Sequence, residues 1–341
     1  MSNKRIIFTA DDYGAYKEID DGIINALKNG SLNSVAMLAN GHDLQKSIRK
    51  IKPFQEAGQV EIGCHFTINS GYALSPAMRE NEFFTHNGHF QPFFKMNFSK
   101  ITHQKHLTQN IETLKGEIVA QLKLLMDNGI KVTHLSSHFN TLIFFKEFCQ
   151  AQNEVLSHPD FKHIKIRSKA VKPKISKSVL RFLSATRSTF KGEKFTEKEV
   201  EEKVEQYYRS IDQWFRKYEA DGNYTPKMAD VLEGFHYQAL GSTRIGRSTR
   251  KRKAKSKSEK LWQKYYEATN ESKSIEFMFH LADKEFMDQN RNRRELKAYL
   301  EGKYAGVTPR YMDNRAVEYA SLSLFTEEYL TELPTKAWEK I

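Results

Sequence analysis

Residues 4–14 read Lys4-Arg5-Ile6-Ile7-Phe8-Thr9-Ala10-Asp11-Asp12-Tyr13-Gly14, an apolar run that ends in two adjacent carboxylates and a glycine. The run predicts a β-strand with both acids at its carboxyl end, where α/β enzymes hold their reacting groups. Two like charges this close raise each other's pKa, so the pair suits one acid that holds a cation and one that takes a proton. The structural alternative is that Asp12 caps a helix beginning where the chain turns at Gly14.

Further apolar runs of strand length follow along the chain, and several of them end on a histidine. They lie at residues 34–38, 59–67, 131–138, 164–167, 231–235 and 274–280. Helical spacing separates them, clearest at 107–128, and a capping box at Thr196 and Glu199 marks a helical region at 175–220. Strands that alternate with helices predict a parallel sheet, and the repetition favours a barrel over an open sheet.

Acids and imidazoles recur at the predicted carboxyl ends of these strands: Asp11, Asp12, His65, His138 and His280. Each histidine alone is more often a hydrogen-bonded residue at a strand end than a ligand. In a barrel, however, the carboxyl ends of the strands converge on one mouth. Two imidazoles and one carboxylate form a common open site for a divalent metal, so the pattern predicts metal-assisted hydrolysis.

Composition limits the alternatives. The chain has 341 residues, of which 39% are hydrophobic and 28% charged, as in a globular protein. Only Cys64 and Cys149 are present, which excludes a disulfide framework and a cysteine-based zinc cluster. No apolar run is long enough to span a membrane, and the first strand leaves no room for a signal peptide. We therefore expect one cytoplasmic domain over residues 1–341.

The net charge of +12 is concentrated between Arg244 and Lys260, where nine of seventeen residues are Lys or Arg. Without aromatics or apolar periodicity, this stretch predicts a basic mobile loop at 241–260. Such a cluster can contact phosphates, and an association with nucleic acid or another polyanion through residues 244–260 is one alternative function. A solvated loop is the favoured interpretation.

Four ordered motifs resemble the YdjC-like carbohydrate deacetylases, which include the chitooligosaccharide deacetylases. The motifs are Thr9-Ala10-Asp11-Asp12-Tyr13-Gly14, Gly63-Cys64-His65-Phe66-Thr67, Thr133-His134-Leu135-Ser136-Ser137-His138 and Glu276-Phe277-Met278-Phe279-His280. Weaker agreement lies at residues 87–90, at 117–129, and at Arg315 with Glu318. The resemblance covers nearly the whole chain, except the basic stretch and much of residues 175–220.

The resemblance implies a distorted (β/α) barrel of about seven strands, of the glycoside hydrolase and deacetylase type. It also implies a divalent metal, Mg²⁺ or Zn²⁺, held by Asp12, His65 and His138. Family members remove acetyl groups from N-acetylated amino sugars, and many are homodimers. In this scheme Asp11 is the general base, and His280 protonates the leaving amine. Arg167, at a strand end, either orients Asp11 or binds substrate, and the structural alternative is that it forms only a surface ion pair.

The chain departs from the family pattern near the third and fourth motifs. Ser136, Asn140 and Leu142 stand where the family usually has an acidic residue and two histidines, and Leu281-Ala282 replace a usual Pro-Gly. These changes affect the substrate pocket more than the metal ligands. They leave open an alternative function, a catalytically weakened protein that binds carbohydrate on the same barrel without cleaving it.

Overall fold

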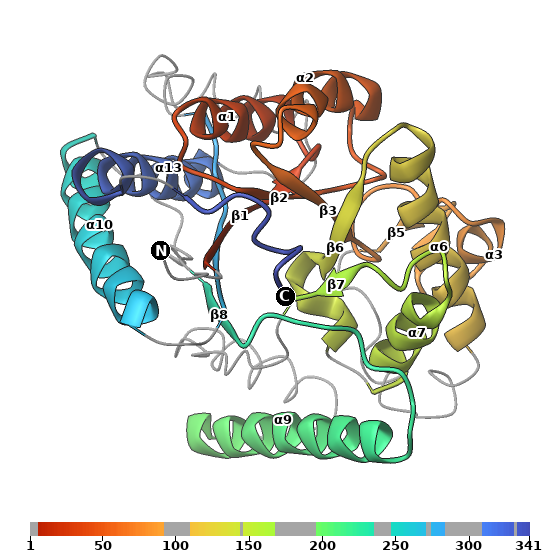
Figure 1. The fold of residues 1–341 in the computed structure, drawn as a ribbon. Helices are drawn as coiled ribbons and strands as arrows, with labels where there is room; N and C mark the ends of the chain where they lie inside the picture. Colours follow the sequence, from red (N-terminus) through yellow and green to blue (C-terminus); the bar gives the residue numbers. More distant parts are fainter. Residues whose placement is uncertain are drawn as a thin grey trace.

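Seven parallel strands form one curled sheet in this computed structural model (Figure 1). The structure describes residues 6–91, 110–143, 146–167, 196–234, 247–270, 274–283, 309–330 and 333–341. In spatial order the strands are β7 (Lys165–Ile166), β6 (Val132–Ser137), β3 (Glu61–Phe66), β2 (Ser34–Met37), β1 (Ile6–Tyr13), β9 (Ile275–Phe279) and β8 (Val231–Gly234). All their pairings are parallel.

The two edges of the sheet meet next to β7. Ile166 in β7 makes a parallel bridge to Met228, three residues before β8, and its N–H donates to the carbonyl of Lys227 at 2.8 Å. Because this single bridge joins the first strand of the order to the segment that leads into the last, the sheet closes into a distorted barrel. The predicted fold, with about seven strands, is confirmed.

Helices surround the barrel in the order expected for βα units. Their bounds are α1 (Lys17–Lys28), α2 (Leu44–Glu56), α6 (Ile111–Asp127), α7 (Lys146–Ser157), α9 (Glu197–Ala220), α10 (Arg247–Asn270) and α13 (Pro309–Tyr329). The connection after β3 carries a short helix, α3 (Pro76–Arg79), and a hairpin of β4 (Thr85–His86) and β5 (His89–Phe90). A 3-10 helix, η1 (His138–Ile143), follows β6. None of the described helices has the length and apolarity needed to cross a membrane.

The acidic pair does not begin a helix. Helix α1 starts at Lys17, and its N-cap residue is Tyr16, four residues beyond Asp12. Ile19, Ile23 and Leu27 form the buried face of α1, as their spacing predicts. The structural alternative for Asp12, a helix cap, is therefore wrong.

The basic stretch is a helix where the structure describes it, so the prediction of a mobile loop is wrong for residues 247–260. This segment forms the first half of α10, and Ala254, Ser258 and Leu261 are each 1% exposed. These three residues are spaced by four and three positions, as on one face of a helix. Two of them are small, so their hydrophobicity alone does not reveal this buried face. The buried face packs beside α13. Residues 235–246 lie outside the described part.

Helix α9 covers residues 197–220 of the helical region predicted at 175–220, and residues 168–195 lie outside the described part. The predicted capping box is confirmed, since Thr196 and Glu199 bond each other's backbone N–H groups. Figure 1 shows α9 set apart along one side of the barrel. Near its end, Phe215 packs on Cys149 of α7. The domain limits themselves stay a prediction.

The C-terminal segment closes the amino end of the barrel. Trp338 is fully buried, stacks on His134 with ring centroids 4.5 Å apart, and donates from Nε1 to Ser34 Oγ at 2.9 Å. Its backbone N–H donates to Glu61 at 2.7 Å. Ser34 and Glu61 are the first residues of β2 and β3, which places Trp338 at the end opposite the strand-end acids and histidines.

Candidate metal centre and catalytic site

An irregularity in β1 lets both acids of the pair reach the mouth of the barrel. In a regular strand, neighbouring side chains point to opposite faces. Here the register with β2 shifts between Ala10 and Tyr13, and Asp12 has φ of +68°, in the left-handed region. Aspartate tolerates this conformation better than most residues. Bulges often re-aim a side chain beside a functional site, and this one gives Asp11 and Asp12 separate sets of partners.

Asp12 lies between two histidines from different strands. His138 Nδ1 is 2.8 Å and His65 Nε2 is 3.1 Å from the same oxygen, Asp12 Oδ1. One potential ligand atom from each of the three residues lies within 4.8 Å of the others, and Asp12 and His65 are buried. The structure thus brings together the three residues that the resemblance assigns to a metal.

The surroundings of His65 fit a bound cation. Ser136 Oγ on the neighbouring strand is 2.8 Å from His65 Nδ1, which fixes the ring. His65 Nε2 is buried and has no hydrogen-bond partner within the described residues, although it faces Asp12. A buried polar nitrogen without a hydrogen bond is costly, and a metal ion would satisfy it. Two imidazoles and a carboxylate are also a suitable donor set for a divalent ion.

Arg315, from α13, holds the other oxygen of Asp12. Its Nη2 lies 2.6 Å from Asp12 Oδ2, so Oδ1 is the oxygen that faces the histidines. Burial opposes the charge on Asp12, but His138 and Arg315 hold the pKa of this carboxyl well below its ordinary value. The expectation that the two acids raise each other's pKa is wrong here, because each has a cationic partner of its own.

Arg167 is the partner of Asp11. Its Nη1 and Nη2 lie 2.6 and 2.7 Å from the two oxygens of Asp11, in a bidentate pair. The same guanidinium bonds Glu276 of β9 through Nε and Nη2, and Nη1 contacts the sulfur of Met278. All three of its nitrogens are therefore engaged within the protein, which favours the orienting role over substrate binding.

The buried pair fixes the charge state of Asp11. Burial opposes ionisation, but Arg167 foremost, and then His65 and His280, hold the pKa of the Asp11 carboxyl below its ordinary value. Asp11 is therefore a carboxylate with a fixed orientation.

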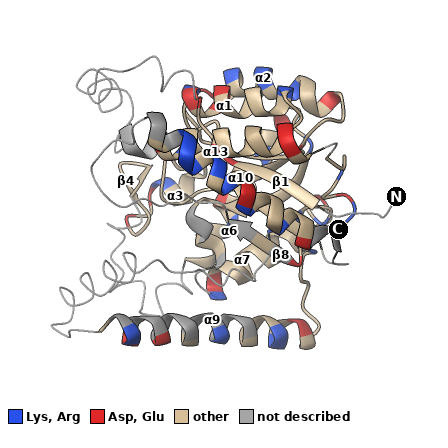
Figure 2. Ribbon diagram, turned by 90° about the vertical axis from the view of Figure 1, so that its left-hand side faces the viewer, with Lys and Arg blue, Asp and Glu red and all other residues tan. Residues whose placement is uncertain are grey.

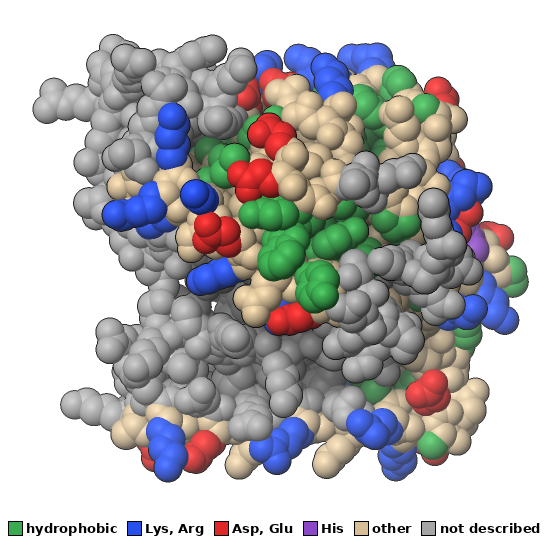
Figure 3. All heavy atoms as spheres, turned by 60° about the vertical axis from the view of Figure 1, so that its left-hand side comes forward, with side chains coloured by type: hydrophobic (Ala, Val, Ile, Leu, Met, Phe, Trp, Pro, Cys, Tyr) green, Lys and Arg blue, Asp and Glu red, His purple; other side chains and the backbone are tan. Residues whose placement is uncertain are grey.

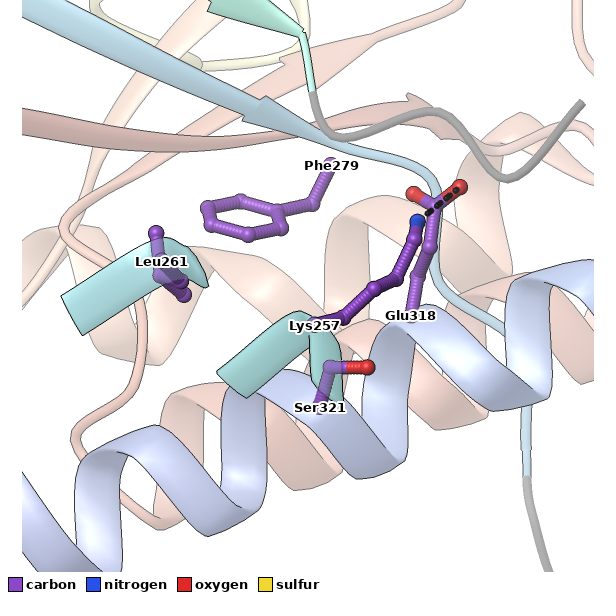
Figure 4. A pocket seen from close by; sticks show the side chains of 5 residues that line it. All are labelled: Lys257, Leu261, Phe279, Glu318 and Ser321. Carbon is purple, nitrogen blue, oxygen red and sulfur yellow. Dashed lines mark ion pairs between the residues drawn. The ribbon is translucent and has the colours of Figure 1, made fainter. Parts of the chain in front are cut away.

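His280 follows β9 and is held from the helix side. Its backbone N–H donates to Glu318 of α13 at 2.7 Å, and its Nδ1 is 4.0 Å from the same carboxylate oxygen. Lys257 of α10 approaches the other oxygen at 3.8 Å. Figure 4 shows the side chains of Lys257 and Glu318 meeting at a small recess between α10 and α13. Leu261, Phe279 and Ser321 also line this recess.

Three contributors to the site were given no role from the sequence. Ser136 was noted only as a departure from the family pattern. Glu276 shares a strand face with His280 by the period of two, a signal that could have revealed it. Arg315 lies 303 residues from Asp12 on a helix, and no local pattern predicts their contact.

His134 falls on the same face as Ser136 and His138 by the period of two along β6, but it lies deeper in the barrel. Its ring occupies the space beside Gly63, where an added Cβ would be 2.3 Å away. Burial, and next the charge of Arg167, lower the pKa of His134 to about 3. It is a neutral core residue that separates the site from the Trp338 end.

Two curated relatives share part of the sequence. A protein of Thermoanaerobacter pseudethanolicus described as a carbohydrate deacetylase is 25% identical over 135 residues, which are 40% of this chain and 50% of that protein. A Clostridium beijerinckii protein with the same description is 28% identical over 137 residues, 39% of this chain and 49% of that protein. The chain thus spans about half the length of these relatives.

A solved structure resembles nearly the whole chain. It is described as a putative cellobiose-phosphate cleavage protein from Enterococcus faecalis, with a TM-score of 0.61, 17% identity and 98% of both chains covered. At this identity the match supports the fold alone. The model of the family described as YdjC-like protein matches residues 5–323, which is most of the chain. The chain therefore belongs to the YdjC-like protein family.

Proposed function

We propose that this protein is a metal-dependent hydrolase that removes acetyl groups from N-acetylated amino sugars. The observation that carries the proposal is the convergence of Asp12, His65 and His138 at the barrel mouth, beside a second carboxylate, Asp11. The descriptions of the curated relatives as carbohydrate deacetylases support the reaction class. The acetyl amide of the sugar is the bond to be cleaved.

Asp12, His65 and His138 would hold one divalent ion, Mg²⁺ or Zn²⁺. Such an ion supplies Lewis-acid polarisation of the acetyl carbonyl and makes water more acidic. Arg315 holds Asp12 Oδ2 and so directs Oδ1 toward the two imidazoles. Ser136 orients His65 from the far side of its ring.

Asp11 would take the proton from the attacking water. Arg167 keeps Asp11 ionised, which is the form that can accept a proton, and fixes the orientation of its carboxylate. The same pairing lowers its affinity for the proton, so Asp11 can pass it on after the attack. Arg167 therefore acts through Asp11 and is a positioning residue in this scheme.

His280 would give a proton to the departing nitrogen. An amine anion is too basic to leave unprotonated, and imidazole supplies a proton near neutral pH. The bond from the His280 backbone to Glu318 fixes this residue at the end of β9. The imidazole is 18% exposed, so a substrate in the mouth can reach it.

An acetate-release assay tests the proposal directly. The substrates are a panel of N-acetylated mono- and oligosaccharides, and the enzyme is measured as purified, after treatment with a chelator, and after addition of Mg²⁺ or Zn²⁺. We expect acetate release from at least one sugar, loss with chelator and recovery with metal. Tight sugar binding without acetate release under any metal would instead support the carbohydrate-binding alternative.

Two variants separate the assigned roles. Asp11→Asn is expected to retain the metal and to lose about 10² to 10⁴-fold in turnover, the usual contribution of a general base. Loss of metal from this variant would mean that the two carboxylates are assigned the wrong way round. His280→Ala is expected to lower kcat on an amide more than on an ester analogue, since an alkoxide leaves with less need of a proton. Equal losses on both substrates would make His280 a binding residue.

A further inference from the structure

The first half of α10 carries several positive charges that form no ion pair within the described residues. Residues 247–260 contain eight Lys or Arg and one acid. Lys251, Arg252 and Lys255 are exposed, and no ion pair within the described residues neutralises them. Positive side chains in the first turns of a helix oppose its macrodipole, and like charges four residues apart repel each other. A bound anion would relieve both costs.

The position of this half of α10 is fixed by contacts along the helix. Tyr265 packs on Phe8 inside the length of β1, Leu261 lies beside Phe279, and Lys257 reaches Glu318 at the level of His280. Going back along α10 therefore leads from the body of the barrel to its mouth. At 1.5 Å per residue, the cations at 251–255 stand beyond the level of His280, on the side where a substrate would enter.

Helix packing makes these cations a fixed surface instead of a mobile tail. Ala254 and Ser258 are buried on an adjacent stripe of α10, next to α13. Figure 2 shows Lys and Arg positions along α10 in front of the barrel. Figure 3 shows Lys and Arg side chains at the molecular surface on the side of Figure 1 that is turned forward. We name the exposed side chains of Lys251, Arg252 and Lys255 the α10 cationic surface.

We propose that the α10 cationic surface binds the acidic groups of a glycan whose N-acetylated sugar occupies the metal site. This inference rests on the proposed function and names its substrate class, an acidic oligo- or polysaccharide. A chain of sugars that carries carboxylates or other anions at intervals can reach both the cations and the mouth. The cations would also raise the association rate of such a substrate.

Single-stranded nucleic acid fits this surface less well. Its binding normally combines a basic groove with aromatic side chains on which bases stack. No aromatic residue lies within 247–260, and the exposed aromatics of this helix, Trp262 and Tyr266, lie further from the mouth. The cations and the two exposed aromatic residues therefore lie at different distances from the mouth along α10.

Binding measurements test the proposal without requiring turnover. The probes are a short hyaluronan oligosaccharide, which alternates N-acetylglucosamine with glucuronate, a neutral N-acetylglucosamine oligomer of matched length, and a single-stranded DNA oligomer. The test variant combines Lys251→Glu, Arg252→Glu and Lys255→Glu. A matched control reverses Lys46, Arg49 and Lys123, which are exposed on α2 and α6.

We expect the acidic oligosaccharide to bind with an affinity that falls as salt rises, and to lose about tenfold or more in affinity in the test variant, because three charge contacts become repulsive. The control variant is expected to change by less than about twofold, as is typical for remote surface charges. Binding of the neutral oligomer is expected to be the same in both variants.

Three results would overturn the proposal: equal affinity of the test and control variants for the acidic oligosaccharide, tighter binding of DNA than of the glycan, or a change of oligomeric state in the test variant alone. Acetate release from the neutral oligomer is measured in parallel. If it persists while the surface shows no glycan binding, the deacetylase proposal stands and only the acidic substrate class fails.

Discussion

Asp11 and Asp12 are neighbours in the chain, yet the barrel gives them different partners. Asp11 is bound to Arg167, and Asp12 is shared by two imidazoles and Arg315. The left-handed backbone at Asp12 makes this division possible. A sequence pattern can place both acids at a strand end, but the sign of their pKa shifts depends on two arginines that reach the site from other elements.

Ser136 offers a test at the scale of one residue. Its hydroxyl holds His65 Nδ1, where a carboxylate would hold the ring more strongly and make it a more basic ligand. We expect Ser136→Ala to weaken metal affinity by about 10 to 100-fold and Ser136→Asp to strengthen it relative to wild type. Metal affinity is measured by competition with a chromophoric chelator, independently of activity.

Ser34→Ala is the matched control for this prediction. Ser34 is a buried serine on the adjacent strand β2 that bonds Trp338 and does not contact His65. Its replacement is expected to lower stability but to leave metal affinity unchanged. If all three variants bind metal alike, Ser136 does not position His65.

At the scale of secondary-structure elements, α10 shows how packing overrides a charge pattern. Lys and Arg are good helix formers, so a basic run can be helical when one face finds a partner. In α10 that face consists of Ala254, Ser258 and Leu261, and the partner is α13. The sequence showed the charges but not the partner, because α13 begins about fifty residues later in the chain.

Leu261→Ala tests whether α10 is part of the folded core. The side chain is 1% exposed, so its truncation is expected to cost about 2–5 kcal/mol of unfolding free energy. Urea denaturation measures the change, and Lys260→Ala, at an exposed neighbour, is expected to stay within about 0.5 kcal/mol. Equal stability of both variants would restore the interpretation of this stretch as a mobile segment.

Asp20, in the first turn of α1, makes the free energy of unfolding depend on pH. Burial raises the pKa of Asp20 to about 6, although Ser47 and the Gly14 N–H donate hydrogen bonds to its carboxylate. The folded state therefore binds this proton more tightly than the unfolded state. The stabilisation is complete below the ordinary pKa of 3.8 and is lost as the pH rises through about 6.

We accordingly predict that Asp20→Asn flattens the stability profile between pH 4 and 6. The pH-dependent part of the unfolding free energy that the variant loses is on the order of 3 kcal/mol, which corresponds to about two pKa units. The measurement is the free energy of unfolding of wild type and variant by denaturant at a series of pH values. Parallel profiles for the two proteins would show that Asp20 does not titrate in this range.

At the scale of the whole molecule, the two ends of the barrel hold different residues, and the C-terminal segment closes one of them. The mouth carries the acids and histidines, and Trp338 fills the opposite end between Ser34, Glu61 and His134. Ile7, Ala229 and Ala337 complete this cluster. Because His134 lies between the two ends, the closed end is expected to support the site only through the rigidity of the barrel.

Trp338→Ala is expected to destabilise the protein by about 3–5 kcal/mol, the usual range for a buried aromatic residue. Trp338→Phe keeps a ring against His134 but loses the bond to Ser34, so its loss is expected to be smaller. Thermal unfolding ranks the variants, and metal affinity is expected to be unchanged in both. A loss of metal in Trp338→Phe would contradict the separation of the two ends.

The sequence by itself determined the strands of the main sheet, some of the helices, such as α6, and the residues that stand at the strand ends. Period-two and helical spacings are local properties, so β1, β3, β6 and β9 could be placed, and with them Asp11, Asp12, His65, His138 and His280. The parallel barrel then followed from the alternation of elements.

Only the tertiary structure decided which groups neutralise these residues and what covers each helix. Arg167, Arg315 and Ser136 meet the acids and His65 across separations of 71 to 303 residues. The same holds for the packing of α10 on α13 and of Trp338 in the closed end. Such contacts arise from closure of the sheet and carry no local periodicity, so a single sequence does not reveal them.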